Sequence, residues 1–117
     1  MSGPLGPHPR LRVWIEDSPA RVNIRVAGEL DLATVPQLRQ IVDAHARSGQ
    51  TMVIDLREID FIDSMGLATL VRARHRALAR GAKLELVAAP ERVHRVFTLT
   101  HLDRVFDWVA GSDAPPD

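Results

Sequence analysis

Apolar residues follow two different spacings in turn along this chain, and that alternation constrains the fold more than any other feature. Between residues 22 and 27 nearly every second residue is apolar, which is typical of a strand with one buried face. Between residues 35 and 42 the apolar residues recur at the spacing of an amphipathic helix. Strands interleaved with helices predict a mixed sheet with helices packed against its face.

The spacing predicts strands and helices in the order β-β-α-β-α-β-α. Strands are expected at residues 11–16, 22–27, 52–56 and 84–87, and helices at the segments that begin near Thr34, Ser64 and Pro90. A polar turn at 17–20 joins the first two strands into an antiparallel hairpin, and Gly28 ends the second strand. We expect residues 102–109 to close the fold as a short helix or an edge strand.

The predicted helices carry start and stop signals as well as apolar faces. Thr34 and Gln37 fit a capping box at the start of the first helix, and Gly81 ends the second. The inner face of the second helix is expected to hold Leu67, Leu70, Val71 and Leu78. At the contact between the central strand and this helix, we expect buried side chains at Val53, Ile54, Leu56, Leu70 and Val71.

One domain, residues 11–109, is expected between two flexible terminal segments, 1–10 and 110–117. The first segment is crowded with proline and glycine, and the last is polar with two prolines. No internal repeat or linker divides the residues between them. A chain of 117 residues is long enough for a single domain with a sizeable core.

The composition argues against several classes of function. Fifteen basic and fifteen acidic residues balance, which gives no support to nucleic-acid or anionic-membrane binding. Cysteine is absent, so disulfides and thiolate chemistry are excluded. No apolar run approaches the ~20 residues that span a bilayer, and the first nine residues lack the pattern of a signal peptide. We therefore expect a cytoplasmic protein that contacts neither membrane nor nucleic acid.

A search for catalytic motifs gives no enzyme signature. The sequence lacks a GxxxxGK[ST] phosphate loop, a GxGxxG fingerprint and a GxSxG elbow. Its five histidines do not pair at a metal-binding spacing, so we expect neither a metal ion nor a cofactor. Arg72, Arg76 and Arg80 share one stripe of the second predicted helix. Such a stripe is usually solvated, but it can also meet an acidic partner.

The segment from Asp60 to Leu67 is the strongest local candidate for a functional site. It lies where a loop after the central strand enters the second helix. In the structural interpretation, Ser64 is the helix N-cap and Asp63 complements the positive end of the helix. In the functional interpretation, Ser64 presents its hydroxyl at a helix start, where free N–H groups can hold a phosphate. Gly66 would then let another backbone come close.

Several segments, in this order, resemble the STAS domain family, and within it the bacterial anti-sigma factor antagonists. They are Ala27-Gly-Glu-Leu-Asp31, Val53-Ile-Asp-Leu56, Asp63-Ser-Met-Gly-Leu67, Ala88-Ala-Pro-Glu-Arg-Val93 and Phe97-Thr-Leu-Thr-His-Leu-Asp-Arg-Val-Phe106. The resemblance covers about residues 11 to 109. It implies an α/β fold with a STAS-like mixed sheet and helices packed chiefly on one face.

The resemblance also implies a regulatory function without catalysis. Such an antagonist binds an anti-sigma factor that is itself an ATP-dependent serine kinase, and thereby frees a sigma factor for transcription. Phosphorylation of the serine that matches Ser64 blocks this partner switching, and a phosphatase restores it. The implied partner-binding residues are Glu29, Asp31, Asp63, Met65 and Gly66.

The sequence departs from the family pattern at three places, and two other functions remain as alternatives. Met65 stands where the family usually has a small or hydroxyl residue, and His101 stands where it often has glycine. Residues 66–69 read Gly-Leu-Ala-Thr in place of the more usual Gly-Leu-Gly.

One alternative is a non-phosphorylated STAS interaction module in another assembly, such as lipid transport or a signalling scaffold. The other is a small enzyme or nucleotide-binding protein, which a titration with ATP alone would distinguish.

Overall fold

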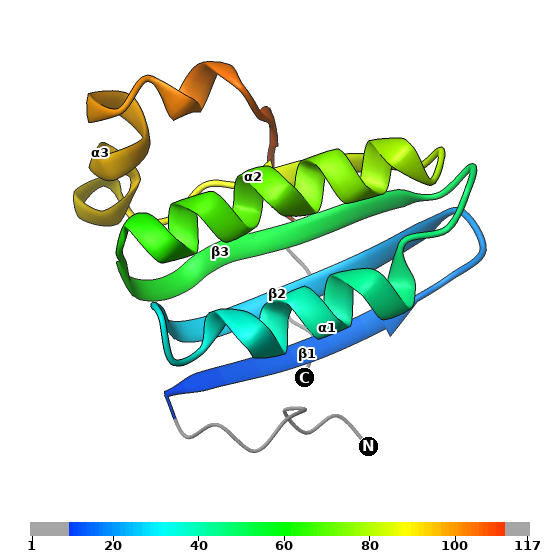
Figure 1. Ribbon diagram of the computed structural model, residues 1–117, viewed down its shortest axis with the longest axis horizontal. Helices are drawn as coiled ribbons and strands as arrows, with labels where there is room; N and C mark the ends of the chain where they lie inside the picture. Colours follow the sequence, from blue (N-terminus) through cyan, green and yellow to red (C-terminus); the bar gives the residue numbers. More distant parts are fainter. Residues whose placement is uncertain (1–9, 112–117) are drawn as a thin grey trace.

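The computed structural model describes residues 10–111, which form one five-stranded mixed sheet (Figure 1). The strands are β1 (Leu11–Asp17), β2 (Arg21–Leu30), β3 (Thr51–Ile62), β4 (Lys83–Val87) and β5 (Asp107–Val109). They lie in the order β1-β2-β3-β4-β5. β1 is antiparallel to β2, and the other neighbours are parallel. The predicted terminal segments, apart from Arg10, Ala110 and Gly111, lie outside the described residues.

Three α-helices and one short 3₁₀ helix complete the described chain. They are α1 (Val35–His45), α2 (Ser64–Ala79), α3 (Glu91–Leu99) and the 3₁₀ helix η1 (Leu102–Arg104). α1 and α2 lie side by side over one face of the sheet, and α3 lies at the end where β3 runs into α2 (Figure 1). The predicted element order is confirmed, and the closing segment supplies both a short helix and an edge strand. No helix within residues 10–111 is long and apolar enough to span a membrane.

The main core lies between the sheet and the helices. Alternate residues of the strands point into it, and Ile54, Leu56 and Leu70 are fully buried there, as predicted. Two other members of the predicted core were placed wrongly. Val53 is buried, but it belongs to the opposite, uncovered face of the sheet because neighbours in a strand point to opposite sides. Val71 is only partly buried and packs at the margin of the core.

β3 is longer than predicted, since the expected loop after Leu56 is a continuation of the strand to Ile62. Two irregularities in the pairing with β2 insert extra residues on β3. As a result, the buried positions follow one another as Leu56, Ile59 and Ile62, three residues apart. This spacing lacks the alternation that marks a strand. β2 likewise continues past Gly28 to Leu30, so Gly28 does not end it.

The inner face of α2 is made mainly of small residues, which let the helix lie close to the sheet. Ala73 and Ala77 are buried, whereas Leu78, predicted on this face, is half-exposed. Because successive residues of a helix are rotated by ~100°, Leu78 points well away from the direction of Ala77. The predicted position of Leu78 was therefore wrong.

The other face of the sheet is not covered by any described helix. It carries a hollow of about 350 Å³ with Trp14, Val53 and Val87 among its lining residues. The guanidinium group of Arg25 lies over the Trp14 ring, 4.2 Å from the ring centre. Long polar side chains thus cover apolar residues here in place of a helix.

Candidate functional site

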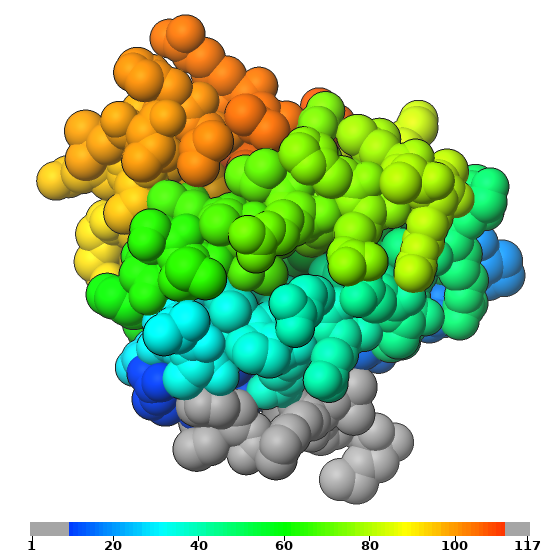
Figure 2. Space-filling model, in the orientation of Figure 1, coloured from blue at the N-terminus to red at the C-terminus, as the bar shows by residue number. Residues whose placement is uncertain are grey.

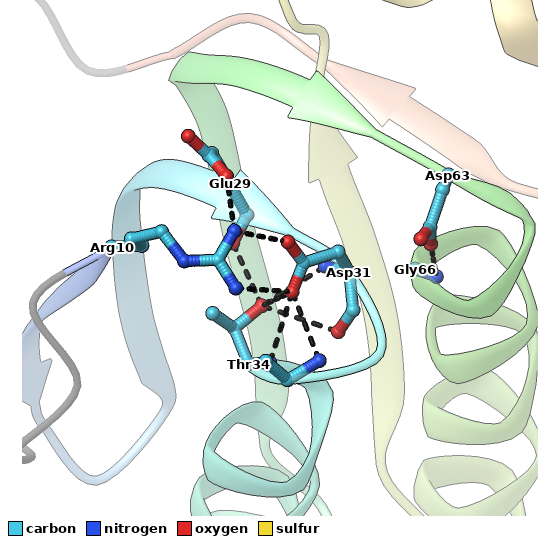
Figure 3. A network of polar contacts seen from close by, with 7 residues as sticks. Arg10, Glu29, Asp31, Thr34, Asp63 and Gly66 are labelled. Carbon is cyan, nitrogen blue, oxygen red and sulfur yellow. Dashed lines mark hydrogen bonds and ion pairs between the residues drawn. The ribbon is translucent and has the colours of Figure 1, made fainter.

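The candidate site lies where β2 and β3 end and their helices begin. β2 and β3 are parallel neighbours, and Leu30 pairs with Ile62 at their carboxyl ends. The loop before α1 and the start of α2 are consequently brought to the same edge of the sheet (Figure 3). The Asp63 N–H donates to the Leu30 carbonyl oxygen at 3.2 Å and links the two segments.

Asp63 caps α2, and Ser64 is the first residue of the helix. The Asp63 carboxylate accepts a hydrogen bond from the Gly66 N–H at 3.0 Å, and the Asp63 carbonyl accepts one from the Leu67 N–H at 3.0 Å. The structural interpretation, in which Ser64 is the cap, is therefore wrong, and the cap is Asp63. The Ser64 side chain is exposed, and its hydroxyl makes no hydrogen bond with the part of the chain that the structure describes.

The start of α2 has two further donors that its own cap leaves unused. A helix has no internal acceptor for its first N–H groups. The N–H groups of Ser64 and Met65 also find no acceptor outside the helix among residues 10–111. They lie at the positive end of the helix dipole, which favours an anionic group near Ser64.

Gly66 is needed for the contact between the two segments. A Cβ atom at this position would lie 2.6 Å from the Leu30 carbonyl oxygen and 2.7 Å from Cγ1 of Ile62. Gly66 is buried, and the backbone that approaches it belongs to this chain. The absence of a side chain therefore fixes how closely the two loops meet.

An ion-pair cluster holds the loop before α1 (Figure 3). Arg10 donates to Glu29 Oε1 at 2.5 Å and to Asp31 Oδ2 at 2.6 Å. Sequence reasoning brought the two acidic residues together but missed Arg10, which it assigned to a terminal segment. The hairpin register could have indicated it: Leu11 pairs with Gly28, and the Glu29 N–H donates to the Arg10 carbonyl at 2.8 Å.

Asp31 organises the turn that leads into α1. Its Oδ1 accepts hydrogen bonds from the backbone N–H groups of Ala33, at 3.0 Å, and Thr34, at 3.2 Å. The Thr34 hydroxyl donates to the Glu29 carbonyl at 2.8 Å and makes no helix-capping bond. The predicted capping box is therefore wrong at Thr34, because this hydroxyl serves the turn.

The charge of Asp31 is stabilised by its surroundings. Partial burial acts to raise the pKa of the Asp31 carboxyl, but hydrogen bonds from Arg10 and from two backbone N–H groups outweigh it. The pKa of Asp31 consequently lies below its ordinary value, and that of Arg10 is raised by the same contacts. Asp31 therefore stays ionised at neutral pH while its negative charge is largely compensated.

Taken together, these residues form a surface suited to recognition and to covalent modification. A hydroxyl and two N–H groups without acceptors or donors among residues 10–111, and a carboxylate pair bridged by arginine, lie at one edge of the sheet. Met65 is half-buried beside Ser64, and Leu32 is an exposed apolar residue of the neighbouring loop. No group of three or more potential metal ligands occurs among residues 10–111.

Comparisons with known proteins show the family to which the fold belongs. The family model described as STAS domain matches residues 14–113. The chain is 28% identical over 103 residues to the anti-sigma-B factor antagonist of Bacillus subtilis (strain 168), which covers 88% of this chain and 94% of that protein.

Two solved structures are similar in fold and in sequence. An anti-sigma factor antagonist from Mycobacterium paratuberculosis superposes with a TM-score of 0.77 at 30% identity, covering 91% of this chain and 92% of the other. The anti-sigma factor antagonist SpoIIAA in its unphosphorylated form gives a TM-score of 0.67 at 27% identity, covering 86% and 89%. This chain belongs to the STAS domain family.

Proposed function

We propose that this protein is an anti-sigma factor antagonist, which binds an anti-sigma factor serine kinase and so releases a sigma factor. Phosphorylation of Ser64 inactivates it, and a phosphatase reverses the modification. The observation that carries the proposal is the exposed Ser64 hydroxyl, left unbonded by residues 10–111 at the start of α2. A serine with a capping duty would turn its oxygen toward the N–H groups of the helix, whereas here Asp63 performs the capping.

The names of the relatives support the same function. The relatives reported above are anti-sigma factor antagonists, and one of them is described in its unphosphorylated form. In this chain the partner would bind the edge formed by Glu29, Asp31, Asp63, Met65 and Gly66. Gly66 contributes by holding the two loops together. The partner supplies the bound ATP, and the protein acts in the cytoplasm without its own cofactor.

Phosphate on Ser64 would act through local charge and bulk. A phosphoserine brings close to two negative charges, and the Asp63 carboxylate belongs to the preceding residue. In an interface that excludes water, a unit charge about 5 Å from another costs roughly 3 kcal/mol at an effective dielectric near 20. The same pair already costs roughly 1 kcal/mol in water, so closing the interface adds roughly 2 kcal/mol per unit charge, about a thirtyfold loss of affinity. Asp31 adds less repulsion because Arg10 compensates its charge.

The test begins with the partner. Proteins that co-purify with the native protein are identified by mass spectrometry, and the phosphorylation state of Ser64 is measured in the same sample. The purified kinase and ATP are then expected to add one phosphate to the wild type and none to Ser64→Ala. Ser48→Ala is the matched control, because Ser48 is another exposed serine and should not alter labelling.

Binding measurements then separate the switch from a scaffold. Ser64→Ala should bind the kinase as wild type does, and Ser64→Glu should bind at least about tenfold more weakly, which is ~1.4 kcal/mol. Circular dichroism checks that each variant is folded. If folded Ser64→Glu binds as tightly as wild type, a non-phosphorylated STAS interaction module in another assembly becomes the better assignment.

A further inference from the structure

A shallow furrow separates α1 from α2 on the outer surface of the helical layer, which Figure 2 shows. We call it the arginine furrow. Its lining consists of Arg39 and Val42 of α1 and Thr69, Arg72, Ala73 and Arg76 of α2. The enclosed space is about 10 Å³, so its deepest part has room for a group the size of one water molecule.

The guanidinium groups at the furrow have little counter-charge. Arg39 and Arg72 form no ion pair with any residue between 10 and 111. Arg76 Nε lies 3.3 Å from Asp43 Oδ1, but that oxygen accepts no hydrogen bond. Arg80, one turn further along α2, donates to the backbone carbonyl of Asp43. Among residues 10–111, Asp43 is therefore the one carboxylate paired with any of these arginines, and it pairs with Arg76 alone.

A polar group at the furrow also lacks a protein partner. Thr69 is 6% exposed, and its hydroxyl makes no hydrogen bond within the described part of the chain. It is a donor that belongs to the same lining as the three guanidinium groups. The combination suits a carboxylate, which accepts hydrogen bonds and balances the positive charge.

The spacing of the arginines matches the spacing of carboxylate side chains along a polypeptide. Arg72 and Arg76 are one turn apart, which places them about 6 Å from each other along α2. Carboxylates two residues apart on an extended strand are separated by ~6.6 Å, and those four apart on a helix by ~6 Å. Thr69 is about 7.5 Å along the same helix from Ser64. A protein that covers Ser64 would therefore extend over the furrow.

We propose that the arginine furrow binds an acidic segment of the protein partner, with glutamate or aspartate side chains placed between Arg39, Arg72 and Arg76. The inference rests on the proposed function for the identity of the partner. The acidic character of the bound segment is inferred from the residues of the furrow. A protein carboxylate is favoured over nucleic acid or anionic lipid because the chain has no net positive charge and a single lysine, Lys83. The furrow would increase the rate and the affinity with which the protein binds the partner whose binding Ser64 controls.

The probe is a short synthetic peptide that alternates glutamate and serine, titrated into the full-length protein. The Nε–Hε signals of Arg39, Arg72 and Arg76 should shift in NMR spectra. Binding should weaken as ionic strength rises from about 50 to 300 mM, since salt screens exposed charges. Arg72→Glu and Arg39→Glu should each weaken binding at least about tenfold. Arg95→Glu is the matched control, an exposed helical arginine without an ion pair in residues 10–111, and should leave binding unchanged.

Several outcomes would overturn the inference. They are no binding of the peptide, equal loss in Arg95→Glu, or equally tight binding of duplex DNA or phosphatidylglycerol vesicles at the same arginines. Ser64→Glu should bind the peptide like wild type, because the furrow does not include Ser64. Once the kinase has been identified, its binding to Arg72→Glu can be measured. If Arg72→Glu binds the kinase as tightly as wild type, the furrow has no role in binding and the proposed function still stands. If Arg72→Glu lost kinase binding while Ser64→Glu bound the kinase as tightly as wild type, the furrow would stand and the proposed switch at Ser64 would be overturned.

Discussion

The Asp63 carboxylate accepts a hydrogen bond from the backbone N–H of Gly66 at 3.0 Å and thereby closes the first turn of α2. The bond occupies the donor that a serine cap would otherwise use, and the neighbouring hydroxyl of Ser64 stays exposed. At this helix start the structural duty falls on Asp63. Under the proposed function the regulatory duty falls on the adjacent Ser64, so a change at Ser64 is expected to alter recognition without altering the fold.

The division of duties predicts different effects on stability. Asp63→Ala should lower the free energy of unfolding by ~0.5–2 kcal/mol, the usual cost of losing an N-cap. Ser64→Ala should change it by less than about 0.5 kcal/mol, as at an ordinary surface position. Urea denaturation at neutral pH measures both. Equal losses in the two variants would mean that the serine shares the cap.

A second pair of variants tests the packing of α2. Leu70 is fully buried, so Leu70→Ala should cost ~2–5 kcal/mol through lost burial and the cavity left behind. Leu78 is 48% exposed on the same helix, and Leu78→Ala should cost less than about 1 kcal/mol. Reversible denaturation of both proteins gives the comparison. A larger loss at Leu78 would show that α2 is rotated from the orientation described above.

The third prediction concerns how the stability of the fold decreases at acidic pH. The pKa of Asp31 is lower in the folded protein than its ordinary value of 3.8. Its ionised form therefore stabilises the fold fully above about pH 3.8, and the contribution is lost as pH falls toward the folded pKa. Arg10→Gln should move the pKa of Asp31 upward, measured by NMR titration of its carboxyl group.

The neighbouring arginine provides the control for that titration. Arg12 is exposed and has no ion pair among the described residues, so Arg12→Gln should leave the Asp31 curve as it is in wild type. An unchanged Asp31 curve in Arg10→Gln would show that Arg10 does not hold this carboxylate in solution.

The apolar periodicity predicted the layers of the fold because each element keeps a regular buried face. It failed where the chain departs from that regularity. The irregular pairing of β2 with β3 changes the buried spacing from two to three after Leu56, and no local signal marks such a shift. Leu78 was misplaced because it points about 100° away from the direction of Ala77, which is buried.

The candidate site was predictable in its residues and less so in their roles. Asp63 and Ser64 are both good cap residues, so the sequence could not decide between them. Only the backbone geometry shows which oxygen meets the Gly66 N–H. Arg10 was missed because its contacts depend on the register of the hairpin, which places residue 10 beside residue 29.

His101 offers a last test, at a position where the related family often has glycine. It follows the C-cap of α3 with φ of 62°, in the left-handed region that side chains other than glycine adopt at a cost. His101→Gly should therefore raise the free energy of unfolding by about 0.5–1 kcal/mol, because relief of strain exceeds the added flexibility of the unfolded chain. Thr100→Gly is the control, since Thr100 has φ of −94° and gains no relief. It should lower stability, and a similar loss in His101→Gly would show that the histidine is not strained in solution.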